Sequence, residues 1–186
     1  MLQYLPHAVG QSLRARRPGT SRLALHRPEA AAAPLAITLL SPAFSDGAEL
    51  PRRCTADGEG LSPPLVWQGV PAAAATLVLM IEDADSPTAE PLVHAIAPAL
   101  PLRRVGLDEG ALNGGAIRLG RNSYLRANWL APDPPPGHGP HRYVFQLFAL
   151  AAGAVIGETP GRREILKAMQ DRVLAKGCLT GVYGRV

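Results

Sequence analysis

One stretch constrains the fold more than any other, residues 131–150, which read APDPPPGHGPHRYVFQLFAL. Its first half holds the three consecutive prolines 134–136. Proline fixes its own φ angle and keeps the preceding residue extended, so this half must be a stiff, non-helical loop. The second half, from His141 to Leu150, contains no Gly or Pro and is rich in β-branched and aromatic residues, which predicts a strand.

This strand carries two polar side chains directly after the loop. Side chains alternate along a strand, so His141 and Tyr143 lie on one face, roughly 7 Å apart. A rigid loop thus delivers an imidazole and a phenol to the mouth of a strand, an arrangement that predicts a pocket.

Composition narrows the class of protein. A chain of 186 residues, 47% hydrophobic and 18% charged, is typical of one globular domain with a substantial core. Its 19 glycines and 19 prolines, with short apolar runs between them, favour a β-rich fold over a helical bundle. The net charge of +4 is modest, and no block of Lys and Arg is dense enough to indicate nucleic-acid binding.

The cysteines and the apolar runs bear on location. Cys54 and Cys178 lie far apart without metal-ligand spacing, which predicts free thiols in a reducing compartment, with a bridge as the alternative. The first residues lack the apolar segment of a secretory signal, and no run approaches the ~20 apolar residues that cross a bilayer. We therefore expect a cytoplasmic protein.

Apolar runs predict the regular elements. Strands are expected at residues 35–40, 62–67, 76–81, 92–97, 141–150 and 179–183. The run at 76–81 is almost continuously apolar, as in a strand buried on both faces. A helix is expected to begin at Thr159 and Pro160 and to end at Gly177. Its apolar stripe is Ile165, Leu166, Met169 and Val173.

Residues 1–34 form an N-terminal arm, expected to be a short helix and an alanine-rich connector ahead of a domain at 35–186. Its apolar residues are spaced for one helical face, and its basic residues are all arginines: Leu2, Leu5, Val9 and Leu13; Arg14, Arg16, Arg17, Arg22 and Arg27. We favour a helix packed on its own domain over an arm that contacts acidic lipid or a partner. We expect the arm to support packing or association and to be dispensable for the pocket.

The strands at 76–81 and 92–97 are joined by about ten residues, so they are expected to pair as a hairpin that sets Asp83 close to His94. A carboxylate beside an imidazole raises the pKa of that imidazole, which can then donate to an anion near neutral pH. With the hydroxyl of Tyr143 and an apolar wall of prolines, these residues predict a pocket for a small phosphate or phosphate ester. Affinity should rise from pH 8 to pH 6, and His141→Ala should remove most of that dependence.

Each of these signals has a simpler interpretation. A histidine at a strand end is often structural, and Asp83–Asp85 is more often an Asx-type turn than a catalytic pair. Zinc ligands could be drawn from Asp83, His94, His138 and His141, but no spacing is that of a metal site, so we expect neither metal nor cofactor. No G-x-S-x-G, P-loop or dinucleotide motif is present.

Two motifs together resemble those of the phosphatidylethanolamine-binding proteins, a family that includes the Raf kinase inhibitor proteins. The first is Asp83–Pro87 followed by His94, and the second is residues 131–135 followed by His141–Arg142–Tyr143. Flanking segments agree, namely residues 41–51, 62–67 and 122–124. The resemblance covers about residues 35–186, and the C-terminal end looks like the bacterial branch. The chain departs from the pattern at Ala84, Ser86, Ala95 and Ala131.

The resemblance implies a mainly β fold, an antiparallel sandwich of two sheets with a C-terminal helix near the pocket mouth and short peripheral helices. It places five residues around an anion pocket, with Tyr183 at its border: Asp83, His94, Pro135, His141 and Tyr143. His138 has no sure counterpart in the family and remains a candidate.

We therefore expect a non-enzymatic protein that binds small anionic or phosphorylated ligands, such as phospholipid headgroups or phosphorylated side chains. One alternative is a hydrolase or lyase that uses Asp83, His94 and His141 as acid and base. Another is a regulator that inhibits a protein kinase or a protease through its surface. A membrane surface and a second copy of the chain are the remaining candidate partners.

Overall fold

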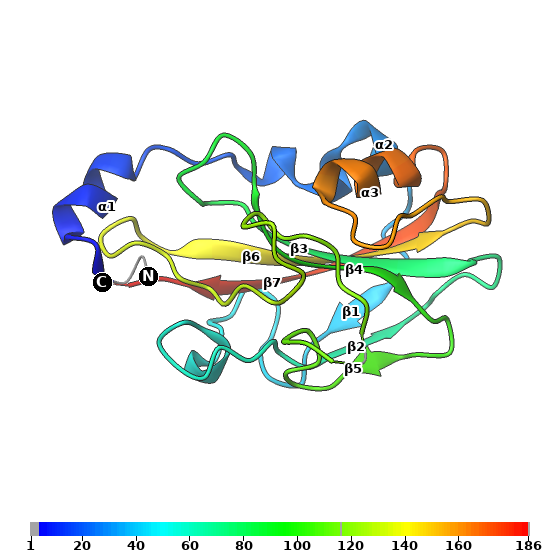
Figure 1. Cartoon of the computed structure of the whole chain (residues 1–186), viewed down its shortest axis with the longest axis horizontal. Helices are drawn as coiled ribbons and strands as arrows, with labels where there is room; N and C mark the ends of the chain where they lie inside the picture. Colours follow the sequence, from blue (N-terminus) through cyan, green and yellow to red (C-terminus); the bar gives the residue numbers. More distant parts are fainter. Residues whose placement is uncertain (1–3, 116, 186) are drawn as a thin grey trace.

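The computed structural model describes residues 4–115 and 117–185, and it has two antiparallel sheets packed face to face (Figure 1). The larger sheet has the order β4 (Leu92–Leu100), β3 (Thr76–Asp83), β6 (His141–Leu150) and β7 (Val173–Tyr183). The smaller sheet has the order β1 (Thr38–Leu40), β2 (Leu65–Gln68) and β5 (Gly106–Leu107). The predicted β-sandwich is confirmed, and the five predicted strands from residue 35 to residue 150 appear with somewhat different bounds.

Hydrophobic side chains bury both faces of the larger sheet. Between the two sheets, Trp67, Leu79 and Phe145 belong to one core. On the outer face, Met80 and Phe148 belong to a second core, covered by the N-terminal segment and by α2 (Pro28–Ala31) and α3 (Arg162–Met169) (Figure 1). This second layer explains why β3 has no solvent-exposed face, since every residue from 77 to 83 is buried.

The predicted C-terminal helix is shorter than expected. It begins after Gly161, whose backbone N–H donates to the side chain of Glu164, and it ends at Met169 rather than at Gly177. Asp171 adopts a left-handed conformation (φ 57°), which ends the helical segment. Residues 173–183 then pair with β6 along its whole length, so Val173 belongs to a strand and not to the helical stripe. Long sheet pairing prevails here over local helical spacing.

The N-terminal segment comprises α1 (His7–Leu13), two 3₁₀ turns (Thr20–Arg22 and Ala24–His26) and α2. The first helix does not pack through the apolar stripe predicted for it, because Val9 is exposed while Leu5 and Leu13 are only half-buried. Leu2 lies outside the described residues. The helix instead packs through Gly10, where an added Cβ would lie 1.9 Å from the carbonyl oxygen of Pro136. The backbone of α1 therefore lies directly against the proline loop.

Buried polar side chains on the outer face of the sheet bind the backbone of the segment that follows α1. Glu82 accepts a hydrogen bond from the N–H of Ala24 at 2.7 Å, and Gln146 accepts one from the N–H of Leu25 at 2.8 Å. Lys176 donates to the carbonyls of Leu25, Ala30 and Ala31. The segment is thus part of the fold's outer layer.

One exposed loop residue is in a strained conformation. Leu125 is 80% exposed and has φ 61°, while Asn122 holds the surrounding turn by accepting from the N–H groups of Tyr124 and Arg126. A left-handed conformation costs a residue other than glycine about 1–2 kcal/mol, which exceeds the entropic cost of glycine. Leu125→Gly should therefore raise the free energy of unfolding by about 0.5–1 kcal/mol in urea denaturation. Leu102→Gly, an exposed leucine outside the positive-φ region, should lower it; equal destabilisation by both would contradict the argument.

Candidate functional site

The polar residues gather at one end of the larger sheet, where the ends of β3, β4 and β6 meet. Asp83 pairs with Tyr143 on one side and with Leu92 on the other. A cavity of about 50 Å³ lies at this end. Its lining includes five of the predicted site residues: Asp83, His94, Pro135, His141 and Tyr143.

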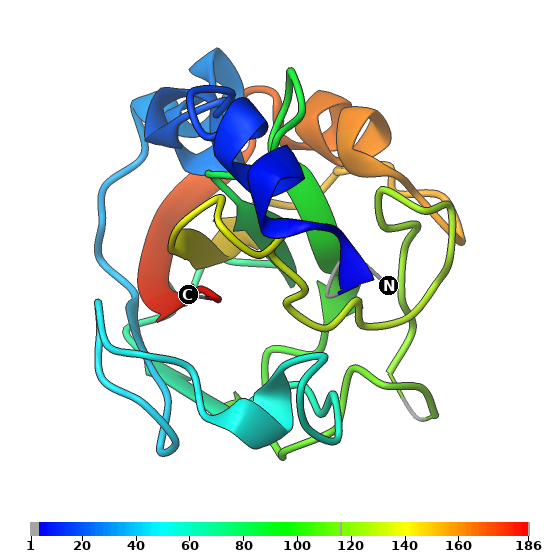
Figure 2. The same ribbon diagram turned by 90° about the vertical axis from the view of Figure 1, so that its left-hand side faces the viewer.

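Tyr183, the sixth predicted residue, borders a different hollow. It lines a separate open cleft of about 540 Å³ between α1, the end of β7 and residues 137–140. The hydroxyl of Tyr183 donates to the carboxylate of Asp57, which also binds Arg185. Figure 2 shows this end of the molecule, with α1 lying over the loop that precedes β6.

The predicted pairing of Asp83 with His94 is wrong, although β3 and β4 do form the predicted hairpin. Asp83 Oδ2 lies 2.7 Å from His141 Nδ1, whereas His94 Nδ1 lies 2.5 Å from the carbonyl oxygen of Leu130. The reason is a bulge, since Ile81 pairs with Ala95 and Glu82 with Val93, which leaves His94 as the extra residue of β4. A bulge redirects the side chain of its extra residue.

The surroundings of His94 favour its neutral form, in which Nε2 is a hydrogen-bond acceptor that faces the cavity. Burial lowers the pKa of His94, and the nearby charge of Asp83 opposes this shift only in part. Because a carbonyl oxygen can only accept, Nδ1 must carry the proton that bonds to Leu130, and the neutral ring keeps a lone pair on Nε2. The environment of His94 is therefore the opposite of the predicted one, in which a carboxylate raises its pKa.

Two buried polar atoms in the cavity have no hydrogen-bond partner among the described residues, His94 Nε2 and the Tyr143 hydroxyl. The two rings meet edge to face, with centroids 5.0 Å apart. Burial raises the pKa of Tyr143 well above its usual value, so this group remains a hydroxyl and a donor. The pair can thus hydrogen-bond to a third, incoming group.

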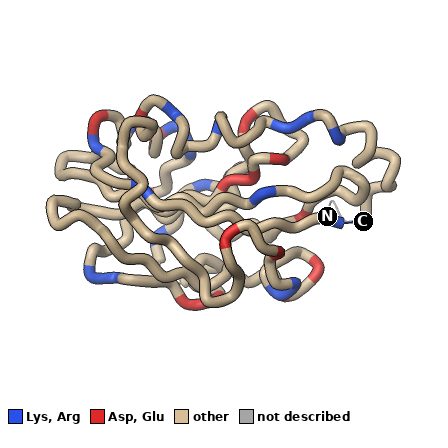
Figure 3. The backbone as a smooth tube through the Cα atoms, turned by 180° about the vertical axis from the view of Figure 1, so that it is seen from behind, with Lys and Arg blue, Asp and Glu red and all other residues tan. Residues whose placement is uncertain are grey.

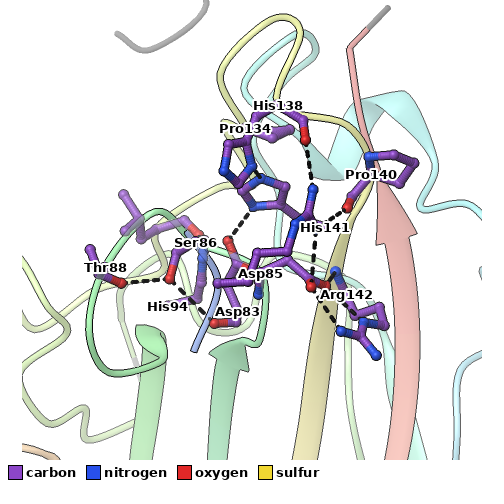
Figure 4. Close-up of polar contacts among 12 residues, drawn as sticks. Asp83, Asp85, Ser86, Thr88, His94, Pro134, His138, Pro140, His141 and Arg142 are labelled. Atoms are coloured by element: carbon purple, nitrogen blue, oxygen red, sulfur yellow. Dashed lines mark hydrogen bonds and ion pairs between the residues drawn. The ribbon is translucent and has the colours of Figure 1, made fainter. Parts of the chain in front are cut away.

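His138, a candidate without an assigned role in the sequence, belongs to the site. His141 Nε2 lies 2.7 Å from His138 Nδ1, and His138 Nε2 lies 2.9 Å from the carbonyl oxygen of Leu13 (Figure 4 shows the two rings and Asp83). Both histidines are buried. A continuous chain of hydrogen bonds therefore runs from Asp83 through His141 and His138 to α1, and it is called the histidine chain below.

Asp85 is a structural residue rather than a partner of Asp83 in catalysis. Asp83 accepts from the N–H of Asp85 at 2.7 Å, which is the Asx-type turn considered above. The carboxylate of Asp85 binds the Arg142 guanidinium and lies 3.0 Å from Arg17. Burial opposes the ionisation of Asp85, but the hydrogen bonds from Arg142 and Arg17 outweigh it and lower its pKa to about 2.

Arg17 is a site residue that the sequence did not reveal. Besides Asp85, its guanidinium donates to the carbonyls of His138 and Pro140, at 2.6 and 2.9 Å. It thereby ties the first motif loop to the second. Its only visible signal was membership of an arginine-rich segment, because the contact spans more than a hundred residues of sequence.

No group of three or more His, Cys, Asp or Glu side chains within residues 4–115 and 117–185 is placed to hold a metal ion. The described parts of the chain also contain no helix long and apolar enough to span a bilayer. Cys54 and Cys178 are both free. Seen from behind, Lys and Arg are interspersed with Asp and Glu along the backbone (Figure 3).

Comparison with known proteins places the chain in a family. Residues 40–184 match the family model described as phosphatidylethanolamine-binding protein. A UPF0098 protein of Methanothermobacter thermautotrophicus is 36% identical over 156 residues, covering 80% of this chain and 99% of that protein. The crystal structure of a phosphatidylethanolamine-binding protein homologue from Chlamydia trachomatis has a TM-score of 0.75 at 32% identity, over 82% of this chain and 99% of that one. E. coli YbcL, at 22% identity and a TM-score of 0.71 over 80% of this chain and 98% of its own, shares the fold. The chain therefore belongs to the phosphatidylethanolamine-binding protein family.

Proposed function

We propose that this protein binds a small phosphate-bearing or anionic group, such as the phosphate of a phospholipid headgroup, between His94 and Tyr143. The observation that carries the proposal is the pair of buried, unpartnered polar atoms in one cavity, His94 Nε2 and the Tyr143 hydroxyl. Buried polar atoms are nearly always hydrogen-bonded, and two adjacent exceptions indicate a place for a polar ligand.

The charges around the cavity support an anion. Each neighbouring carboxylate has a cationic or protonatable partner: Asp83 has His141, Asp85 has Arg142 and Arg17, and Asp133 has Arg185. The arginines therefore compensate the charges of Asp85 and Asp133, and Asp83 accepts a hydrogen bond from His141, so an incoming anion does not face three free carboxylates. An uncompensated cluster of this kind would instead favour a cation.

The size of the cavity limits the ligand. A volume of about 50 Å³ is a few times the roughly 10–15 Å³ that a cavity needs to hold one water, which suits one small polyatomic group. Pro134 and Pro135 form one wall, and their rigid backbone keeps the cavity narrow. We infer that only the phosphate end of a larger ligand enters and that the remainder stays outside.

The arrangement of His141 favours binding over hydrolysis. A general base that activates a nucleophile must have a nitrogen within hydrogen-bond reach of a hydroxyl, thiol or water. Both ring nitrogens of His141 are occupied, one by Asp83 and the other by His138. His141 therefore cannot act as the general base of the hydrolase alternative in this arrangement.

Tyr143→Phe tests the proposal. It removes one unpartnered hydroxyl without leaving a cavity, so the fold should persist, while a hydrogen bond to a charged ligand, worth about 1.5–3 kcal/mol, is lost. Phosphate affinity at pH 6, measured by calorimetric titration, should fall by about tenfold or more.

The matched control is Tyr183→Phe, which removes a hydroxyl that bonds to Asp57 outside the cavity. It should bind phosphate as tightly as the wild type. Equal affinity of Tyr143→Phe and wild type, or an absence of binding heat in the wild type, would overturn the proposed site.

A further inference from the structure

The mouth of the anion cavity is apolar. It is formed by the lining residues that remain exposed or half-buried: Pro87, Leu92, Tyr124, Leu130, Ala131 and Asp133. The carboxylate of Asp133 is bound to Arg185 at 2.7 Å. The backbone of Leu130 is also occupied, because its N–H donates to the His94 carbonyl and its own carbonyl accepts from His94 Nδ1. A ligand group that lies in the mouth therefore meets mainly apolar surface.

The floor of the cavity is polar, in contrast to the mouth. Two of its side chains, Asp83 and His141, are committed to the histidine chain. His94 Nε2 and the Tyr143 hydroxyl remain for the phosphate. A polar floor below an apolar mouth suits a phosphate ester whose other end is apolar. An ester group that carries hydroxyls would lose water in this mouth without gaining equivalent hydrogen bonds.

Tyr124 is the aromatic residue of the mouth, and the turn that carries it is fixed to β4. Asn122 is buried, and its side-chain oxygen accepts from the N–H of Tyr124 at 2.9 Å. Ser123 is joined twice to Val93, because its N–H donates to the Val93 carbonyl and its hydroxyl accepts from the Val93 N–H. Val93 directly precedes His94 in the chain. The backbone of Tyr124 is therefore held beside the strand that supplies a floor group of the cavity.

This turn is strained, and its aromatic ring is open to solvent. Leu125, which follows Tyr124, has φ 61° and does not line the cavity. Strained residues persist where the surrounding contacts impose them, and they cluster at ligand sites. Tyr124 itself is 53% exposed, so its ring is accessible to a further flat group. Contact between two aromatic rings adds about two- to tenfold in affinity beyond ordinary apolar burial.

We propose that the preferred ligand of this site is an aryl phosphate, a phosphate monoester of an aromatic alcohol, and that Tyr124 is the residue that selects it. The phosphate meets His94 Nε2 and the Tyr143 hydroxyl on the floor, and the aromatic ester group lies against the Tyr124 ring in the mouth. The inference rests on the proposed function for the phosphate end and adds the class of the ester group.

Calorimetric titration at pH 6 with methyl, n-butyl, phenyl and glycerol phosphate tests the preference. Phenyl phosphate should bind the wild type about tenfold more tightly than methyl phosphate, because its ring is buried in the mouth. n-Butyl phosphate, whose ester group is apolar but not flat, should lie between these two, and glycerol phosphate should gain nothing over methyl phosphate. Phenyl phosphate that binds no better than n-butyl phosphate, or glycerol phosphate that binds as tightly as phenyl phosphate, would overturn the proposal.

Tyr124→Leu provides the decisive comparison, because it keeps an apolar side chain and the backbone contact to Asn122 but removes the ring. The ratio of phenyl to methyl phosphate affinity should fall by about two- to tenfold, while methyl phosphate binds as it does to the wild type. Comparison of ratios between proteins cancels the difference in acidity between the two esters. The matched control is Tyr4→Leu, which removes an 82% exposed tyrosine outside the cavity and should keep the wild-type ratio. A wild-type ratio in Tyr124→Leu would contradict the role of this ring.

Failure of the aryl preference differs from failure of the site itself. If the site is wrong, no ester binds, or methyl phosphate binds Tyr143→Phe as tightly as the wild type. If only the preference is wrong, methyl phosphate binding still depends on Tyr143, but phenyl phosphate has no advantage. A blocked phosphotyrosine, N-acetyl-O-phosphotyrosine amide, distinguishes the sources of the same chemistry. Affinity equal to that of phenyl phosphate would assign an aryl phosphate on a protein side chain, and affinity below that of methyl phosphate would assign a small free ester.

Discussion

Removal of residues 1–28 should abolish the stable fold rather than leave an intact pocket. Leu23 and Leu25 are almost fully buried against the outer face of the larger sheet. Burial of one leucine is worth about 2 kcal/mol, and the sheet residues that it covers lose a similar amount. Three hydrogen bonds to Glu82, Gln146 and Lys176 would be lost as well.

The total loss in the free energy of unfolding is on the order of 5–10 kcal/mol, comparable with the whole stability of a typical domain. Urea denaturation followed by circular dichroism should show no cooperative transition for the truncated protein. Light scattering should show aggregates, because the apolar face around Met80 and Phe148 becomes exposed.

A shorter deletion is the matched control. Removal of residues 1–13 takes away α1 but keeps Arg17 and the buried contacts of residues 23–31. This protein should fold. Its phosphate binding should be weaker, because α1 no longer packs against the proline loop that lines the cavity. A 1–28 deletion that folds and binds phosphate like the full chain would instead establish the modular arm expected from the sequence, and would show that the outer layer contributes little.

The fold could be predicted from the sequence because its strands carry strong local patterns. The run at 76–81 and the strand from His141 to Leu150 have no competing interpretation, and both lie at the centre of the larger sheet. The C-terminal strand was harder to predict from the sequence. Residues 173–176 can continue a helical stripe, and only pairing with β6 makes them extended. Such a partner lies beyond any local window.

The site was predictable in its members but not in its connections. Both motifs named Asp83, His94, His141 and Tyr143, and all four line one cavity. Which histidine binds Asp83 depends on a bulge in β4, and a bulge changes register without a mark in the sequence.

The contributions of the N-terminal segment were hidden for another reason. The polar residues that hold it, such as Glu82 and Lys176, occur singly within otherwise apolar strands. The sequence indicates neither that such residues are buried nor which groups they bind. Arg17 and the Leu13 carbonyl reach the site only through contacts between distant parts of the chain.

Affinity for a small anion should rise steeply as the pH falls from 8 to 6, and His94 should be the main cause. Nδ1 of His94 is committed to the Leu130 carbonyl, so the neutral ring turns a lone pair toward an anion. Protonation converts Nε2 into a charged donor, and a bond of this kind is about twice as strong as a neutral one. Burial lowers the pKa of His94 below its ordinary 6.5 in the free protein, so the anion must bring in the proton.

The direction and the size follow from linkage. Where binding takes up one proton, affinity increases by up to about tenfold for each unit of decrease in pH, until the pH reaches the lowered pKa of the free ring. From pH 8 to pH 6 the gain should therefore be at least about tenfold and at most about a hundredfold for this one group. Phosphate takes up a proton of its own within this range, so sulfate, whose charge is constant from pH 8 to pH 6, is the cleaner probe for calorimetric titration.

Two variants identify the group that responds to pH. His94→Gln supplies an amide donor at every pH, so its sulfate affinity should change by less than about threefold between pH 8 and pH 6, since no proton uptake remains at that position. His141→Ala removes the ring that the sequence alone assigned to this role. It should keep much of the slope, because neither nitrogen of that ring is free to meet the anion. If His141→Ala removes the dependence and His94→Gln retains it, the anion binds at His141, which would require it to displace His138. In that case the pocket defined by His94 and Tyr143 is not the binding site.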